Sequence, residues 1–256
     1  MIGWRVGLLC GVIFCVSAAT LLAPYDPLAM FGANQPPNLT HPFGTDYLGR
    51  DVLSRFLWGG QKTLAVAITA TLSSGGLGVA LGLIAGGIKG LPARLSLFAI
   101  DTLWGIPSML TALVILTLMG AGFWPLTLAV AIPQVAPIAR ITYQATRTAY
   151  ILPYIEAARG LGATPLGILW RHITRAVAPA VIAYIGVVFG YTLLLGSGLA
   201  FLGLGWPLGT PEWGIMLAEG RVGFRTAPWV SLPPGIAITG LIWLVNDTCQ
   251  RFAQGL

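Results

Sequence analysis

Long apolar runs, separated by short polar segments, occupy most of this 256-residue chain. A helix that crosses the hydrocarbon core of a membrane needs about 20 predominantly apolar residues. The runs have about this length, or are somewhat shorter, and they lie at residues 6–23, 63–87, 97–120, 122–139, 181–204 and 232–245. The pattern predicts an all-α integral membrane protein with about six transmembrane helices, of which the third and fourth are joined by a tight turn.

Two of the predicted spans carry glycines at four-residue spacing: Gly78, Gly82 and Gly86 in the second span, and Gly186 and Gly190 in the fifth. Residues four apart lie on the same face of a helix. Small residues on one face let two membrane helices approach closely. We therefore expect tight helix packing along these two faces.

The polar segment at 24–62 is rich in proline and glycine in its first half, which predicts turns there. In its second half, apolar residues recur at close to helical spacing, which predicts a short surface helix over 46–58.

The basic residues indicate the topology, because cytoplasmic loops of membrane proteins carry an excess of lysine and arginine. With the N-terminus inside, the inside segments hold nine basic residues and the outside segments five. This places both termini in the cytoplasm, 24–62 in the periplasm and 140–179 in a cytoplasmic loop. Residues 6–23 also resemble a signal peptide with small residues at 17–20, but further spans follow, which favours a first span.

Composition supports the membrane assignment. Only 9% of the residues are charged, whereas a soluble domain carries about 25%. The formal net charge of +6 is not gathered into a tail, and no zinc-finger or helix-turn-helix signature appears, so nucleic acid is not an expected partner. The cysteines, Cys10, Cys15 and Cys249, have neither disulfide-framework nor metal-ligand spacing.

The segment at 150–179 has the sequence YILPYIEAARGLGATPLGILWRHITRAVAP and lies between two apolar spans. It contains both apolar and charged residues, and most of its charges are basic. Pro153 can start a short helix, Gly162 permits a sharp turn, and Pro165 can start a second helix. In that second helix an apolar face is predicted from residues at three- and four-residue spacing: Leu166, Leu169, Trp170 and Ile173. Two short helices joined at a glycine would form a compact projection suited to docking into a cytoplasmic partner.

Part of this segment, EAARGLGATPLGILWRHI, resembles the EAA loop of bacterial ABC importer permeases. The matching residues are Glu156, Ala157, Ala158 and Gly162, with Arg159 inside the motif. In that family the loop couples the permease to the ATP-hydrolysing subunit. The resemblance implies that the alanines keep the helix thin where it enters a cleft, that Glu156 pairs with a basic group of the ATPase and that Gly162 makes the turn.

Two further segments narrow the resemblance. HPFGTDYLGRDVLSRFLWG, at 41–59, and GLAFLGLGWPLGTPEWGIML, at 198–217, look like outer-loop segments of the peptide and nickel importer permeases, in particular of their C-type subunit. The chain departs from the family pattern at Thr174 and Arg175, where leucine and proline are usual.

The resemblance implies a single permease domain, 1–256, with the type I ABC importer fold in the bacterial inner membrane. Its function would be to move peptides, nickel or metal chelates from periplasm to cytoplasm. The implied partners are a second homologous permease, ATPase subunits that bind ATP and Mg²⁺, an extracytoplasmic binding protein and membrane lipid. The chain itself would be no enzyme and would hold no cofactor, and the P-loop pattern G-x-x-x-x-G-K-[ST] does not occur in it.

A stand-alone, ion-coupled secondary transporter is the alternative. It would need coupling acids or broken helices in paired halves. The halves show no convincing repeat, and Asp101 is the one acid well inside a predicted span. Such an acid costs about 2.5–3.5 kcal/mol at the bilayer centre and usually has a function or a partner. Asp101 lies near the start of its span, so we expect a structural contact with water or Arg94, with a place in the transport pathway as the alternative.

Glu212 and Glu219 flank an outer loop that also contains Trp206 and Trp213. The two acids could receive a cationic cargo, but solvated acids and interfacial tryptophans are the favoured interpretation. We expect Glu212 and Trp213 to make outer-loop contacts, in loops that receive the binding protein. His41 and His172 fall on opposite sides of the predicted membrane, so no shared metal site is expected.

Overall fold

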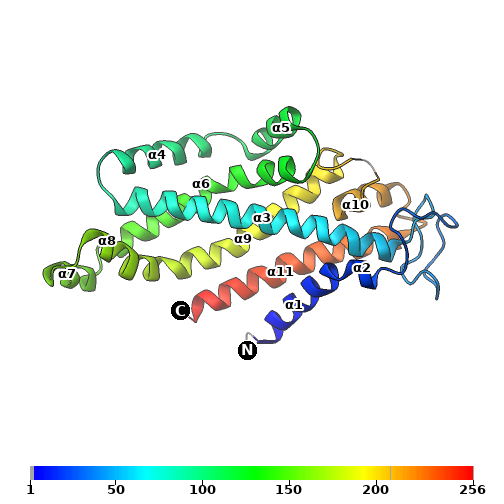
Figure 1. The fold of residues 1–256 in the computed structure, drawn as a ribbon, viewed down its shortest axis with the longest axis horizontal. Helices are drawn as coiled ribbons and strands as arrows, with labels where there is room; N and C mark the ends of the chain where they lie inside the picture. The colour runs from blue at the N-terminus through cyan, green and yellow to red at the C-terminus, as the bar shows by residue number, and fades with distance from the viewer. Residues whose placement is uncertain (1–2, 208, 256) are drawn as a thin grey trace.

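The computed structural model describes residues 3–207 and 209–255. Its long helices run side by side along the long axis of the molecule (Figure 1). The loop that precedes α3 (Val52–Gly87) lies at one end of this bundle, and the short helix α7 (Pro153–Gly160) lies at the other (Figure 1). Both α1 (Gly3–Ser17) and α11 (Leu232–Gln254) are oriented so that the chain termini point toward the α7 end.

Within the described residues the regular structure is helical, apart from isolated β-bridges at Met30–Arg50 and Thr45–Asp51. The α-helices are α1 (Gly3–Ser17), α2 (Ala19–Leu22), α3 (Val52–Gly87), α4 (Leu91–Trp104), α5 (Ser108–Met119), α6 (Phe123–Ala149), α7 (Pro153–Gly160), α8 (Pro165–Ile168), α9 (Thr174–Phe201), α10 (Trp213–Val222) and α11 (Leu232–Gln254). A π-helical turn, Leu169–Ile173, joins α8 to α9, and a 3₁₀ turn, Pro228–Val230, precedes α11.

The described residues give four or five membrane spans by length and composition, against the six predicted. Four helical stretches are long and apolar enough to cross a membrane: Val52–Gly87, Phe123–Ala149, Pro165–Phe201 and Pro228–Gln254. The pair α4 and α5 makes a fifth if it counts as one span. Helix α1 is apolar but has 15 residues, and a turn at Ala18 separates it from α2.

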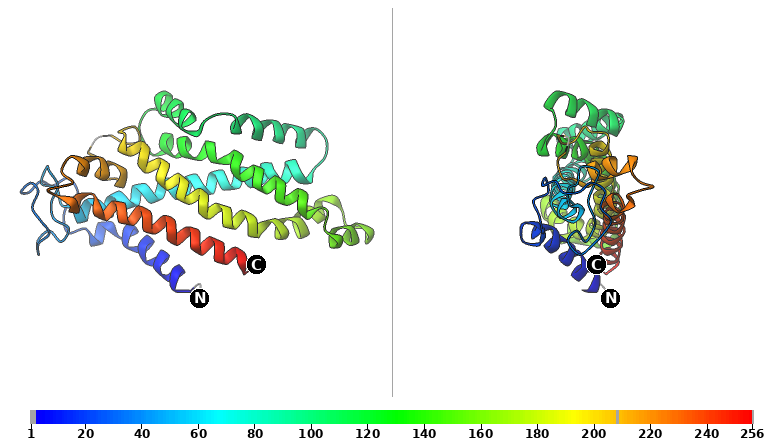
Figure 2. Two further views of the ribbon diagram at one scale, coloured as in Figure 1. Left: turned by 180° about the vertical axis from the view of Figure 1, so that it is seen from behind. Right: turned by 90° about the vertical axis from the view of Figure 1, so that its right-hand side faces the viewer.

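The predicted span at 97–120 is wrong as a single helix, because α4 and α5 meet at an angle of 88°. Gly105 ends α4, and Pro107 stands just before α5. Proline lacks the N–H that would continue the helix, and it disfavours helical geometry at the residue before it. The bent pair lies against the outside of α3 and α6 (Figure 2).

The predicted surface helix at 46–58 is also wrong, because it is not a separate element. Asp51 is the N-cap of α3, and its carboxylate accepts a hydrogen bond of 2.7 Å from Ser54 N. Residues 46–50 form a turn in which Gly49 adopts a φ of +82°. The helix that starts at Val52 then continues without interruption through the predicted second span to Gly87.

The glycines of α3 confirm the predicted close helix packing, and their partner is α6. A Cβ atom at Gly78 would lie 2.7 Å from the Cβ of Ile138, and one at Gly82 would lie 2.5 Å from Ala139 O. At Gly86 the neighbour is Thr146, at 2.8 Å. These distances leave room for hydrogen only, so the two helices touch at their backbones.

The second glycine pair has the same function between α9 and α11. A Cβ atom at Gly186 would lie 2.8 Å from the Cβ of Cys249, and one at Gly190 would lie 3.0 Å from Ile242. The predicted tight hairpin between the third and fourth spans is confirmed as well, since Gly120 ends α5 and α6 begins at Phe123. Helix α6 runs on to Ala149, past the predicted end of its span at 139.

Replacing Gly82 by alanine is expected to destabilise the bundle by about 1–3 kcal/mol, the usual cost of overpacking a filled interior. The matched control is Gly76→Ala in the same helix, where an added Cβ meets nothing within 4 Å. That change should be neutral or slightly stabilising, because alanine favours helix over glycine. The measurement is the thermal unfolding midpoint of each purified variant in one detergent. Equal midpoints for both variants would contradict the close contact.

Candidate functional site

Helix α7 projects beyond the ends of the long helices (Figure 1). It begins at Pro153, as predicted, and ends at Gly160. Gly162 adopts a φ of +84°, a left-handed conformation that residues with a Cβ rarely adopt. Its N–H donates to Arg159 O at 2.9 Å, and the N–H of Ala163 donates to Ala158 O at 3.0 Å. The predicted turn at Gly162 is therefore confirmed, and it reverses the chain between α7 and α8.

One side of α7 is anchored, and the other is open. Ile155 is 0% exposed, whereas Glu156, Ala157 and Arg159 are exposed. Ala158 is half-buried. Glu156, Ala157 and Arg159 are therefore exposed at this end of the molecule, on a helix that is anchored by the buried side chain of Ile155.

The second short helix differs from the prediction. Thr164 caps α8 by accepting a hydrogen bond of 3.1 Å from Gly167 N. Of the predicted apolar face, Leu169 and Ile173 are buried, but Leu166 and Trp170 are 62% and 63% exposed. The π-helical turn at Leu169–Ile173 explains this difference, because its i→i+5 bonding changes the angular spacing on which the three- and four-residue pattern relies.

The anchor of α7 is an apolar cluster that several long helices share. Ile155 packs in it with Leu83 of α3, Ala149 of α6 and Val177 of α9. Nearby, Tyr150 donates a hydrogen bond of 3.1 Å to Gly87 O at the end of α3. The Arg159 guanidinium lies 5.4 Å from the centre of the Tyr150 ring. Helix α7 therefore shares its apolar anchor with residues of three spans.

The surface around α7 is apolar. Ile151 and Leu161 are exposed large side chains beside it, as are Leu166 and Trp170 on the next turn. A hollow of about 680 Å³ lies next to this surface and is lined in part by Lys89, Tyr150, Arg159 and Thr164. We call α7, the turn at Gly162 and α8 the docking projection, after the docking function that the resemblance of this segment predicts.

Asp101 has a partner, but not the one expected. Its carboxylate lies 3.1 Å from Arg140 of α6, and both side chains are partly exposed. The expected contact with Arg94 is not the one that the structure shows. The pair joins α4 to α6, which is a structural contact.

The opposite end of the bundle contains a largely buried network of four charges. Arg50 Nε lies 2.7 Å from Asp46, and Arg50 Nη2 lies 2.9 Å from Glu219. Arg55 Nη2 lies 2.7 Å from the same Glu219 oxygen. Two positive and two negative groups balance, as buried charges require. The expectation that Glu219 is a solvated acid is therefore wrong. Glu219 lies in α10, and its ion pairs connect α10 to α3 and to the loop before α3 (residues 23–51).

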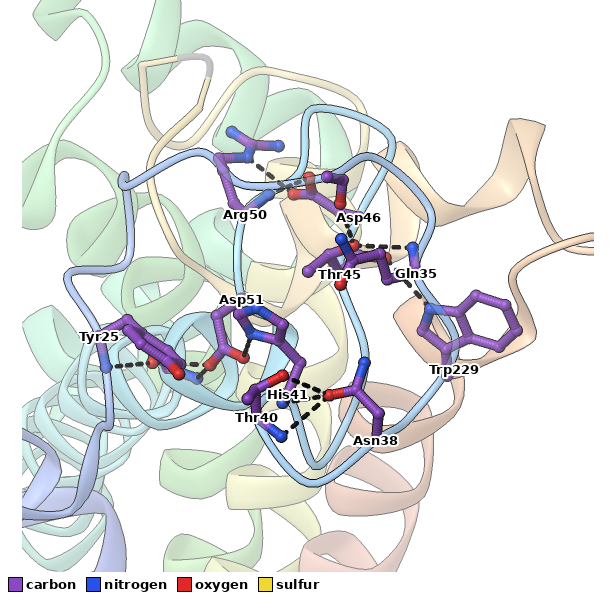
Figure 3. A network of polar contacts seen from close by, with 12 residues as sticks. Tyr25, Gln35, Asn38, Thr40, His41, Thr45, Asp46, Arg50, Asp51 and Trp229 are labelled. Atoms are coloured by element: carbon purple, nitrogen blue, oxygen red, sulfur yellow. Dashed lines mark hydrogen bonds and ion pairs between the residues drawn. The ribbon is translucent and has the colours of Figure 1, made fainter.

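Hydrogen bonds also stabilise the loop before α3, residues 23–51 (Figure 3). His41 Nδ1 lies 2.9 Å from the Asp51 carboxylate, and Asn38 accepts hydrogen bonds from the backbone N–H groups of Thr40 and His41. Trp229 donates from Nε1 to Thr45 O at 3.1 Å. In the part of the chain that the structure describes, no group of three or more His, Cys, Asp or Glu is arranged to hold a metal ion.

Glu212 and Trp213 are 1% and 0% exposed, so as they stand neither is available to a binding protein. Glu212 is the N-cap of α10: one carboxylate oxygen accepts from Ile215 N at 3.0 Å, and the other accepts from Thr63 Oγ1 at 2.7 Å. Trp213 stacks on Phe56 and donates from Nε1 to Phe56 O at 2.9 Å. Both residues fasten α10 to α3 from inside, which corrects the expected surface contacts.

Burial raises the pKa of the Glu212 carboxyl from its ordinary value of 4.5 to about 7. The hydrogen bonds from Thr63 and from the backbone of Ile215 and Gly214 act in the opposite direction, as does the charge of Lys62. Desolvation is the larger effect because it disfavours the charged form of an acid inside the protein.

Sequence reasoning missed the partners of these outer-end residues. In the sequence, Arg50 and Arg55 contribute only to the number of basic residues outside the membrane. Thr63 is only the first residue of the predicted second span. The one available signal was the mixture of acids and bases in GTDYLGRDVLSR, which is unusual for a segment that leads directly into an apolar helix.

Comparison with known proteins identifies the class. Residues 78–250 match the family described as "Binding-protein-dependent transport system inner membrane component". The match covers more than half of the chain, and the chain belongs to this family of transport permeases.

The relatives are permeases for small molecules. The chain is 36% identical over 223 residues to the glutathione transport system permease protein GsiD of Pectobacterium atrosepticum. It is 37% identical over 223 residues to the protein of the same name from Escherichia coli. Each alignment covers 86% of this chain and 74% of the relative. The fold resembles that of the MetNI methionine ABC transporter in an inward facing conformation, with a TM-score of 0.62, 16% identity, and coverage of 79% of this chain and 96% of that one.

These findings confirm the resemblance to the peptide and nickel importer permeases and the type I importer fold. The chain is a multi-pass inner-membrane permease of an ABC importer rather than an enzyme, and ATP hydrolysis belongs to the partner ATPase. Family membership implies an ATPase, a substrate-binding protein and a second permease as partners. It favours the importer over a stand-alone secondary transporter.

The raised pKa of Glu212 predicts a pH-dependent stability. The folded state holds this proton more tightly than the unfolded state, so the contribution is fully present below pH 4.5 and is lost as the pH rises through about 7. The difference in pKa corresponds to about 3 kcal/mol, at about 1.4 kcal/mol per tenfold change. Unfolding midpoints of the wild type and Glu212→Gln, measured across this pH range, should therefore show the wild type losing stability relative to the variant as the pH rises. A difference that does not change with pH would contradict the assignment.

Proposed function

We propose that this chain pairs with a second homologous permease and that the docking projection binds the ATPase on the cytoplasmic side. The observation that carries the proposal is the arrangement of α7: Glu156, Ala157 and Arg159 are exposed, while Ile155 fastens the same helix to α3, α6 and α9. An ATPase that binds ATP and Mg²⁺ and moves α7 would thereby move three spans together. The permease needs no nucleotide site for this mechanism.

The proposed orientation places both termini and the docking projection in the cytoplasm. It is supported by the excess of basic residues in the segments on that side, nine against five. It is also supported by the fold, because the two terminal helices have their free ends directed toward α7 and away from the loop that precedes α3 (Figure 1). That loop and α10 would then face the periplasm, where a binding protein delivers the substrate.

We propose short peptides as the substrate class, with glutathione, itself a tripeptide, as the first candidate. The support is the 36–37% identity to permeases named for glutathione transport over most of the chain. The substrate path would lie between this chain and the second permease, so it would be lined by both subunits.

Replacing Glu156 by lysine is expected to lower ATP-driven import at least about tenfold, which corresponds to a loss of about 1.4 kcal/mol in coupling. The reason is that the new charge repels the basic group that Glu156 would meet on the ATPase. The measurement is substrate uptake into proteoliposomes, together with the amount of ATPase that copurifies with the permease. Gln254→Lys is the control, since Gln254 is exposed near the end of α11 and lies outside the docking projection. Normal import by Glu156→Lys would contradict the docking of α7.

The substrate proposal is tested with labelled glutathione and labelled nickel, each offered to cells that produce the full importer. We expect saturable uptake of glutathione that unlabelled short peptides compete away. We expect Glu156→Lys to lower this uptake by the same factor of at least about ten. Uptake of nickel without uptake of glutathione would overturn the peptide assignment and leave the permease assignment intact.

A further inference from the structure

A small cavity with a mostly apolar wall lies where α3, α9 and the loop before α10 meet. Its volume is about 10 Å³, and its polar lining consists of Thr63, Thr192, Ser197, Trp206 and Glu212. Apolar side chains of Val66, Leu126 and Leu193 complete the wall. The cavity therefore brings together polar groups from several segments in an otherwise apolar part of the bundle.

Two of these polar groups are buried without a protein partner. Ser197 Oγ and Trp206 Nε1 have no hydrogen bond to any residue that the structure describes. A buried donor or acceptor that is left unsatisfied costs about 1–3 kcal/mol. Most such groups in folded proteins are paired with protein or with ordered water. Both residues belong to the wall of the same cavity, so one ligand between them could satisfy both groups.

The third group is the Glu212 carboxylate. It accepts hydrogen bonds from Thr63 Oγ1 and Ile215 N. An ionised carboxylate offers about four acceptor positions. Acceptor capacity therefore remains on a side chain that belongs to the cavity wall.

We propose that this cavity is a binding site for one water molecule that bridges Trp206, Ser197 and Glu212. The water accepts a hydrogen bond from the Trp206 indole N–H, donates one to Glu212, and shares one with Ser197 Oγ. A metal cation does not suit the site, because the indole N–H presents a hydrogen to it and offers no lone pair. The size agrees, since a single water needs about 10–15 Å³ on this measure.

This water would complete the connection of the outer ends of α3, α9 and α10. Thr63 already joins α3 to the N-cap of α10, and it accepts a hydrogen bond of 3.2 Å from Trp213 N. The water adds α9, through Ser197, and the preceding loop, through Trp206. Lys62 lies 5.9 Å from the centre of the Trp206 ring and covers that ring.

The test compares Ser197→Ala with Thr142→Val in the purified importer complex. Thr142 Oγ1 is also buried without a partner, but Thr142 packs against Gly82 and is not part of the cavity wall. If water fills the cavity, Ser197→Ala removes a hydrogen bond and should lower the unfolding midpoint by about 2–4 °C. Thr142→Val removes an unsatisfied hydroxyl and should leave the midpoint unchanged or raise it. A neutral or raised midpoint for Ser197→Ala as well would overturn the proposal.

A double-mutant cycle with Glu212→Gln gives a second readout. Ser197 and Glu212 share no direct hydrogen bond in the described structure, and a water bound to both would couple their effects on the midpoint. We expect the double variant to lose less than the sum of the single losses, and additive losses would overturn the proposal. Should either variant fail to fold, a map of the wild-type complex at a resolution that shows ordered waters decides: a peak between Trp206 Nε1 and Glu212 supports the site, and an empty cavity overturns it.

Discussion

The close contact between α3 and α6 is the constraint on which the rest of the fold depends. Lipid tails are as apolar as leucine, so membrane helices gain little from hydrophobic burial against one another and rely on close packing. Gly78, Gly82 and Gly86 supply that packing by letting the two backbones touch. The other elements are placed around this pair: α4 and α5 lie outside it, and α9 packs against both helices (Figure 2).

The two ends of the bundle differ in how their charged side chains are arranged. At the outer end, the charges of Asp46, Arg50, Arg55 and Glu219 are paired within the chain, and all but Glu219, which is half-buried, are buried. At the other end, the docking projection leaves a charged and apolar surface open. The first arrangement satisfies its charges within the chain, and the second leaves exposed the surface for which we propose docking of the ATPase. Long helices join the two ends, and Ile155 ties the open end to three of them.

The predictions that failed share a cause. The bend at Gly105 and Pro107 was visible in the sequence, but hydropathy averages over such a break and returns a single span. The separate helix at 46–58 was predicted from local spacing, whereas the buried contacts of Asp46 and Asp51 determine where α3 begins. The apolar face with Leu166 and Trp170 assumed α-helical spacing, which the π-helical turn does not have.

The sequence by itself determined what depends on neighbouring residues and on the membrane as solvent. This includes the all-helical membrane class, the glycine faces, and the start of α7 at Pro153 with its turn at Gly162. Only the tertiary structure decided which buried polar groups meet. Glu219 pairs with Arg55 across 164 residues of sequence, and Glu212 accepts from Thr63 across 149. The reason is physical: a charge can be buried only where another segment brings its counter-charge or its hydrogen bond, and no local pattern specifies which segment that is.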